Sequence, residues 1–413
     1  MIQATDKGAR IMRWADELAR HTEAPGMLTR TYLTPAHGGA ANQLAQWMRE
    51  AGMTVRRDNA GNVIGRYEGQ SPDAPSLLTG SHFDTVRDAG KYDGNLGIIL
   101  PIACIAEWNR QERRFPFALE VIGFAEEEGV RFKATLLGSR AIAGSFDKTV
   151  LDKRDNEGRT MREVMTAAGL SADAIDGCAF DPAKALAFME VHIEQGPVLL
   201  DENLPVGVVT AISGASRFMV TAVGLAGHAG TVPMTLRRDA AMTAAEIGLT
   251  IEKRCSGIPG LVGTVGQLEV PNGAANVVPG KAVFTIDIRA ESDDVRLAAV
   301  NDVMAAMRDI AARRNVSLDI HQTHEAKSVP CAGWLQEQLA SAIAGFDLPL
   351  RRLPSGAGHD AMALAGLTDV AMLFVRCGNG GISHHPDETM TAEDADIAAS
   401  IFMRFVEHFK AQS

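Results

Sequence analysis

The sequence lacks the features that would mark a membrane protein or a nucleic-acid-binding protein. Its longest apolar stretch, GIILPIACIAEW at residues 97–108, is too short to cross a bilayer. The formal net charge is −11, and no basic stretch stands out along the chain. Because a phosphate backbone requires a basic protein surface, nucleic acid is excluded as the expected partner.

The sequence also has few cysteines and shows no signal peptide. The five cysteines are scattered and form no CxxC pair, and their odd number fits a reducing compartment. Residues 1–20 are charged and amphipathic and carry no apolar signal-peptide core. We therefore expect a cytoplasmic protein without disulfides.

The chain itself has the composition of an ordinary globular protein. Its 413 residues are 46% hydrophobic and 22% charged, and this length favours two domains. In the first half, short apolar strands alternate with helical segments, which predicts a mainly parallel sheet covered on both faces. The strands are expected at residues 76–80, 117–124 and 186–193, and the helices at 7–21, 37–52 and 95–113.

From about Ser213 the pattern changes to β-α-β-β-α-β, the split arrangement of a ferredoxin-like domain. Its two middle strands are expected at residues 261–270 and 281–290, with a turn at 271–280 between them. After Lys327 the α/β character returns, with a helix at 333–344, a strand at 370–375 and a helix at 392–410. The smaller domain is therefore inserted into the larger one. The predicted domains are 1–212, 213–326 and 327–413.

Polar side chains gather where the predicted parallel strands end, which is where α/β proteins build their sites. The candidates are His82 and Asp84, Asp93, the run Glu126–Glu127–Glu128, His192 with Glu194 and Gln195, and His384 with His385.

Imidazole nitrogens and carboxylate oxygens are ligands for zinc, manganese and similar divalent ions. Several carboxylates in one pocket could not all ionise without a cation, and a metal removes that objection. Each element alone is more often structural: three glutamates after a strand usually form a solvated loop, and paired histidines are common at surfaces. Their joint occurrence at strand ends favours a metal site, in which an unligated glutamate would act as general base.

At these residues the chain resembles a known family, the dinuclear metallohydrolases of the hydantoinase/carbamoylase type. This group contains N-carbamoyl-L-amino-acid hydrolases, β-ureidopropionases and allantoate amidohydrolases, within the wider M20 metallopeptidase-like group. The resemblance runs from about residue 80 to 390 in unbroken motif order. Its motifs are GSHFDTV (80–86), AGKYDGNLG (89–97), AEEEGVRF (125–132), HIEQGPVL (192–199), GHAGTVPM (227–234), SGAGHDA (355–361) and GISHHPDE (381–388).

The resemblance implies a phosphorylase/hydrolase-like catalytic domain with an inserted ferredoxin-like dimerisation domain, and two divalent ions, zinc or manganese. It places His82 and His192 at opposite ions and Asp93 between the ions, with Glu128 and His384 completing the set. Glu127 would be the general base, and Asp84 would orient His82. Glu126 is extra to the motif, and His385 occupies its variable position.

The resemblance also implies a substrate-binding set. His228 would stabilise the oxyanion from a partner subunit, Asn276 and Arg289 would bind a carboxylate, and Gln195 would contact a ureido group. Taken alone, His228 reads as an ordinary loop histidine and Arg289 as a rim charge. The motif at 355–361 adds Ser355, Gly356, Gly358 and His359.

The implied activity is hydrolysis of the ureido C–N bond of a small carboxylate substrate, releasing ammonia and carbon dioxide. Allantoate is the favoured substrate because the stretch at residues 126–144 is similar to bacterial allantoate amidohydrolases. N-carbamoyl-L-amino acids and N-carbamoyl-β-alanine are the alternatives, and a peptidase or acylase of the wider group is less favoured. A binding protein with a vestigial site would lack a ligand, and none is missing. A homodimer is implied through His228.

Overall fold

The computed structural model describes residues 6–412, which form two compact units. The first unit comprises residues 6–210, 331–353 and 358–412; the second comprises Ala211–Pro330 and Pro354–Ala357. The short return to the second unit at Pro354–Ala357 has no counterpart in the sequence-based boundaries at 212 and 326. The division into catalytic and dimerisation domains stays a prediction.

The first unit is built on a mixed sheet with the strand order β1-β2-β4-β3-β5-β16-β6. The four central strands, β4, β3, β5 and β16, are mutually parallel, whereas β1, β2 and β6 pair antiparallel. The predicted mainly parallel α/β sheet is confirmed. Its strands are β1 (Thr54–Arg57), β2 (Val63–Tyr67), β3 (Ser76–His82), β4 (Ala118–Phe124), β5 (Ala185–Ile193), β6 (Val206–Ile212), β15 (Arg352–Ser355) and β16 (Val370–Val375).

Local sequence explains the main helices of this unit. Helix α2 starts after Thr34, whose side chain accepts the backbone N–H of His37, and Pro35 suits the first turn. Helix α11 starts in the same way, with Thr391 accepting the N–H of Asp394. The helices are α1 (Asp6–Leu18), α2 (Pro35–Glu50), α3 (Leu96–Arg110), α4 (Leu137–Ile142), α5 (Met161–Ala167), α6 (Val198–Asp201), α9 (Gly333–Ala344), α10 (Ala361–Leu364) and α11 (Ala392–His408).

The core of the first unit lies on both faces of the sheet. Every residue of β3, β4 and β16 is buried, as expected for parallel strands covered on both sides. Helix α3 is buried along nearly its whole length and packs against α1 and α11. The candidate site residues His82, Glu128 and His192 lie at or just after the carboxyl ends of their strands.

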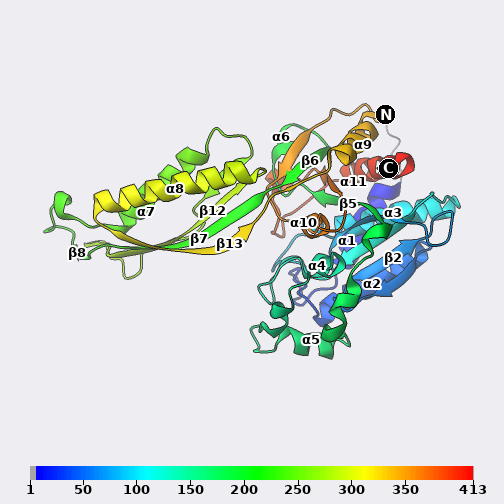
Figure 1. Cartoon of the computed structure of the whole chain (residues 1–413), viewed down its shortest axis with the longest axis horizontal. Coiled ribbons are helices and arrows are strands. Elements are labelled where there is room, and N and C mark those ends of the chain that lie inside the picture. Colours follow the sequence, from blue (N-terminus) through cyan, green and yellow to red (C-terminus); the bar gives the residue numbers. More distant parts are fainter. Residues whose placement is uncertain (1–5, 413) are drawn as a thin grey trace. The chain divides into compact units, whose positions relative to one another are not determined.

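The second unit has the predicted β-α-β-β-α-β order. Its sheet runs β10-β12-β7-β13, with β9 also on β12, and α7 and α8 lie side by side on one face (Figure 1). Burial alternates strictly along β12, so the face opposite the helices stays half-exposed. Its elements are β7 (Gly214–Val223), β8 (Gly227–His228), α7 (Ala240–Cys255), β9 (Leu261–Thr264), β10 (Leu268–Glu269), β11 (Val277–Val278), β12 (Lys281–Ala290), α8 (Asp293–Arg314), β13 (Ser317–Ala326) and β14 (Val329–Pro330).

Two details of the second unit differ from the sequence-based expectation. The strand expected over residues 261–270 is split into β9 and β10, because the register against β12 shifts by one residue between Thr264 and Leu268. The segment expected as a plain turn, residues 271–280, contains β11, which pairs with β8. The two strands are distant in the chain, and each has only two residues, which is too short to show a periodic sequence pattern.

None of the helices formed by residues 6–412 combines the length and the apolar character needed to cross a membrane.

Candidate metal centre

The carboxyl ends of β4, β3, β5 and β16 bring together side chains from five distant segments. His82 is the last residue of β3, His192 lies near the end of β5, and Glu128 follows β4. His384 comes after β16, and Asp93 lies just before α3. These positions follow from the strand order, since neighbouring parallel strands end at the same edge.

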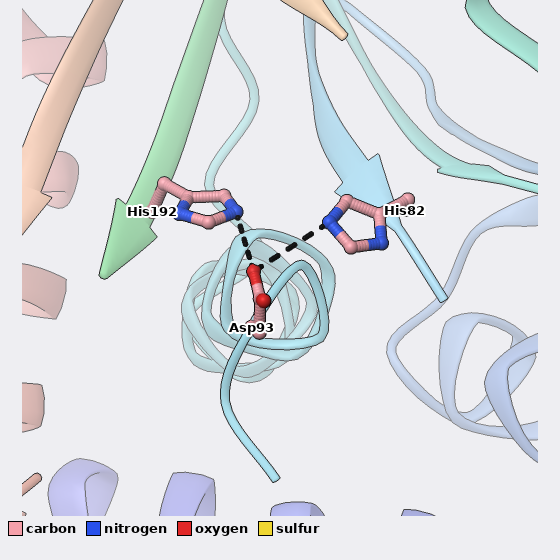
Figure 2. Close-up of side chains that lie close together, drawn as sticks. All are labelled: His82, Asp93 and His192. Carbon is pink, nitrogen blue, oxygen red and sulfur yellow. Dashed lines mark ion pairs between the residues drawn. The ribbon is translucent and has the colours of Figure 1, made fainter. Parts of the chain in front are cut away.

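One group of donors surrounds a single oxygen of Asp93. Its Oδ1 lies 3.3 Å from His192 Nε2 and 3.7 Å from His82 Nε2, and all three side chains are buried. Figure 2 shows both imidazoles, one at the end of each strand, pointing at the carboxylate. Within residues 6–412, no hydrogen bond reaches Asp93 Oδ1. A buried oxygen facing two ring nitrogens without a donor is suited to a cation.

The other ring nitrogens fix which atom of each imidazole is available. His192 Nδ1 lies 2.8 Å from the Ile193 carbonyl oxygen, and His82 Nδ1 lies 3.1 Å from the Asp84 carbonyl oxygen. Because a carbonyl oxygen only accepts, each Nδ1 carries a proton, and Nε2 is left to bind a metal.

A second group surrounds the other oxygen of Asp93. Asp93 Oδ2 lies 3.0 Å from His384 Nε2, which in turn lies 3.6 Å from Glu128 Oε1. Asp93 is therefore shared between two potential cation positions, as the resemblance implies. Because β3 and β5 are adjacent strands, His82 and His192 both lie beside the same oxygen of Asp93. His82 also lies with Glu127 and Glu128 in a third donor group, so the assignment of the two imidazoles to opposite ions stays a prediction.

The acidic side chains at the ends of these strands are crowded and largely removed from water, and this shifts their pKa values when no cation is present. Burial, followed by the charge of Asp93, raises the pKa of Glu128 to about 7. Burial, with the nearby Glu128, also raises the pKa of Glu127 well above its usual range. The hydrogen bond to Asp93 raises the pKa of His384 to about 9. The donor set thus fits divalent cations, which would let these carboxylates ionise together.

The three consecutive glutamates are not equivalent. Glu127 and Glu128 lie with His82 in a group whose ligand atoms are all within 4.8 Å of one another. Glu126 is fully buried, and neither of its carboxylate oxygens has a hydrogen bond of ordinary geometry within residues 6–412. A solvated loop is therefore the wrong interpretation of this run.

Asp84 contacts more than the imidazole that it was expected to orient. Its Oδ1 lies 3.5 Å from His82 Nδ1, while Oδ1 and Oδ2 accept the backbone N–H groups of Glu127 and Glu128 at 2.9 and 3.1 Å. Asp84 thus ties the loop after β4 to the end of β3.

Gln195 and His384 both adopt left-handed backbone conformations, with φ of 55° and 54°. Such conformations are costly for residues other than glycine and cluster at functional sites. The Gln195 side-chain amide donates to Asp93 Oδ2 at 3.1 Å, so this candidate ureido contact lies at the edge of the metal centre.

Two buried charged residues that sequence reasoning missed hold the backbone of the centre. Glu388 Oε1 accepts the N–H groups of Tyr92 and Asp93 at 2.9 and 3.2 Å. Arg30 is fully buried and donates to Asn95 Oδ1 at 2.6 Å, at the start of α3. Glu388 ends the GISHHPDE motif, but its role depends on a partner 296 residues away.

The motif at residues 355–361 is divided between the two units, with Ser355 and Gly356 in the second and Gly358 and His359 in the first. A Cβ built on Gly358 would lie 3.9 Å from Glu127 Oε1. His359 is buried behind the centre, with its ring 4.4 Å from that of His192. Ser355 Oγ forms a local turn with Ala357.

In the second unit, the pairing of β8 with β11 brings two candidates together. The Ala229 N–H donates to the Asn276 carbonyl oxygen at 2.9 Å, directly after His228. The Gly230 N–H donates to His228 Nδ1 at 3.1 Å. A neutral His228 therefore carries its proton on Nε2, where it can donate to a negative oxygen. Arg289 lies elsewhere in this unit, on β12.

The structure is an α/β fold with candidate metal-ligand groups at the carboxyl ends of its parallel strands, and comparison with known proteins identifies the family. The sequence profile of peptidase family M20/M25/M40 matches residues 78–408, and the chain belongs to that family.

Individual relatives cover nearly the whole chain. "Allantoate deiminase 2" of Glycine max is 40% identical over 428 residues, covering 95% of this chain and 87% of the relative. "N-carbamoyl-L-amino acid amidohydrolase" of Geobacillus stearothermophilus is 38% identical and covers 97% and 98%. Among solved structures, an amidase of the hydantoinase/carbamoylase family from Burkholderia multivorans superposes with a TM-score of 0.91, at 31% identity and 97% coverage of both chains.

Proposed function

We propose that this chain is a metal-dependent amidohydrolase that cleaves the ureido C–N bond of a small carboxylate substrate, with allantoate as the first candidate. The observation that carries the proposal is Asp93, whose two oxygens face two separate sets of nitrogen and oxygen donors. The names of the relatives support the substrate class, and they support N-carbamoyl-L-amino acids as the second candidate.

His82, Asp93 and His192 would hold one cation, and Asp93, Glu128 and His384 the other. Bound divalent ions supply Lewis acidity to a carbonyl and lower the pKa of water. Zinc and manganese both suit this donor set.

Glu127 is the proposed general base, because it lies beside His82 and Glu128 and burial raises the pKa of its carboxyl, which makes the ionised carboxylate a stronger proton acceptor. It accepts the proton of the attacking water and donates it to the leaving nitrogen, so that ammonia departs and the carbamate loses carbon dioxide. From the second unit, His228 Nε2–H and Asn276 are proposed to stabilise the developing oxyanion, and Arg289 to bind the carboxylate. Gln195 is the proposed contact for the ureido group.

Ammonia release from allantoate, N-carbamoyl-L-alanine and N-carbamoyl-β-alanine tests this function. The protein is first stripped with a chelator and then assayed with and without added Mn²⁺ or Zn²⁺. We expect turnover of at least one ureido compound, restored only by the metal. Cleavage of dipeptides without activity on any ureido compound would overturn the substrate class.

We further propose a cytoplasmic homodimer formed through the second unit. All five cysteines are buried and free, which suits a reducing compartment. Large apolar side chains of the second unit are exposed, namely Leu225, Met234, Leu236 and Leu249, and a second copy of the chain would cover them. Light scattering of the wild type and of Leu249→Asp tests this assembly: a dimer that dissociates in the variant supports it, and a monomeric wild type contradicts it.

A further inference from the structure

Three charged side chains share the half-exposed sheet face of the second unit. Asp287 and Arg289 are two residues apart on β12 and therefore point to the same side. Arg217 on β7 is paired directly with Asp287 in the strand register. Their neighbours Ile286 and Ile288 are buried beneath the helices on the other side. The sheet thus presents an Arg–Asp–Arg trio to a hollow of about 530 Å³.

Asp287 holds the Arg289 guanidinium at two points. Arg289 Nε donates to Asp287 Oδ1 at 3.0 Å, and Nη2 donates to Oδ2 at 2.8 Å. On its other side, Asp287 Oδ2 accepts Arg217 Nε at 2.9 Å. Arg289 Nη1 donates to the Gly356 carbonyl oxygen at 2.7 Å. Both ends of the guanidinium are therefore fixed within one unit.

This arrangement leaves a defined part of Arg289 unused. Asp287 and Gly356 take the Nε N–H, one N–H of Nη2 and one N–H of Nη1. The second N–H of Nη1 and the second N–H of Nη2 remain to donate to a carboxylate. The trio carries two positive charges and one negative charge, so its net charge matches a single carboxylate.

We propose that Asp287 is a positioning residue that presents the Nη1/Nη2 edge of Arg289 to the substrate carboxylate, and that Arg217 holds Asp287 in place for this task. The inference rests on the proposed function, in which Arg289 binds that carboxylate. A flexible arginine loses rotamer freedom when it binds a ligand, and a guanidinium that is already fixed loses less.

The ionisation of Asp287 agrees with this role. Burial by itself would raise the pKa of Asp287, but the hydrogen bond and charge of Arg289, together with Arg217, hold the pKa below its usual value. The carboxylate is therefore negative at neutral pH and available to both guanidinium groups.

The test uses the full-length, metal-loaded protein and Asp287→Asn, which keeps the shape of the side chain and removes its charge. The substrate is whichever of allantoate and N-carbamoyl-L-alanine the wild type hydrolyses. We expect KM to rise roughly 10- to 100-fold, the range for one lost hydrogen bond to a charged group, while kcat stays within about threefold. Adding Asp287→Asn to Arg289→Met should raise KM no further, because the aspartate acts through the arginine.

Asp302→Asn is the matched control. Asp302 on α8 accepts Arg254 Nε of α7 at 2.8 Å, which is the same chemistry on the helical side of the same unit. Its KM should equal that of the wild type. Thermal melting of all variants verifies that they are folded.

The outcomes separate the inference from the function on which it rests. If Arg289→Met leaves KM unchanged, the proposed role of Arg289 fails and the inference fails with it. If Arg289→Met raises KM but Asp287→Asn does not, or if the effects of the two variants add fully, only the role of Asp287 is overturned.

Discussion

In the first unit, Asp93 turns one buried oxygen toward two imidazoles without receiving a hydrogen bond, whereas in the second unit both oxygens of Asp287 accept guanidinium N–H groups. Each aspartate sits among several charged or ionisable groups at one edge or face of a sheet. The neighbours of Asp93 are a carboxyl group and imidazole nitrogens, so the carboxylates can all ionise only if a cation is added. The neighbours of Asp287 are permanent cations, so its charge is balanced within the chain. The first site therefore fits an added cation, whereas the second carries a net positive charge of its own.

The largest expected effect comes from Asp93→Asn, which removes the carboxylate that both donor groups share. We expect the purified variant to lose both metal ions and all measurable turnover, because each position is left with fewer charged ligands. Elemental analysis together with ammonia release checks this. Asp387→Asn, an exposed change near His384, is the control and should retain full metal content. One ion retained per chain in Asp93→Asn would contradict the shared role.

Glu127→Gln tests whether one acid at this edge moves a proton and does not bind metal. Turnover should fall by roughly 10²- to 10⁴-fold, the usual contribution of a general base. Metal content, measured on the same sample, should equal that of the wild type. Loss of metal would instead mean that the roles of Glu127 and Glu128 are reversed.

A smaller effect is expected from Glu388→Gln, because Glu388 acts on the backbone that carries Asp93. The amide keeps one acceptor but loses the charge and the acceptor for Ser383 Oγ. Metal affinity should fall by roughly 10- to 100-fold, as for other residues that orient ligands. Competition with a fluorescent chelator measures it, with exposed Glu393→Gln as the control. Unchanged affinity would show that the amides of Tyr92 and Asp93 need no acceptor.

The smallest effect is expected at the exposed ion pair between Arg254 and Asp302. Asp302 is 61% exposed in its pair with Arg254, so Asp302→Asn should cost at most about 1 kcal/mol of unfolding free energy. Urea denaturation, followed through the unfolding transition of the second unit, measures this change in unfolding free energy. A loss of several kcal/mol would contradict the small contribution expected of an exposed ion pair.

Much of the first unit could be read from the sequence because its signals are local. The strands β3, β4, β5 and β16 are largely apolar, and the polar candidates lie at the end of each strand or in the segment that follows it. The strands β2 and β6 were missed. Their antiparallel pairing with β4 and β16 joins segments that are distant in the chain, so it depends on the sheet as a whole.

The arrangement within the centre was harder to predict than its members. Which imidazoles share an oxygen of Asp93 depends on β3 and β5 being neighbours, and strand order is a property of the whole sheet. The Glu388 contact and the β8–β11 pairing likewise join segments that are far apart in the chain. The roles assigned to individual site residues stay predictions that the variants above address.

The separation of Tyr92 and Glu388 by 296 residues has a consequence for the order in which the protein matures. During synthesis, His82, Asp93, Glu128 and His192 emerge early, whereas β16, His384 and Glu388 emerge near the end. The second unit lies between them in the chain and has its own hydrophobic core, so it can fold as soon as it leaves the ribosome. The candidate metal centre therefore cannot be completed before the segment after β16 has emerged. A nascent chain stalled before residue 370 would carry a folded second unit, but its candidate metal centre would still lack His384.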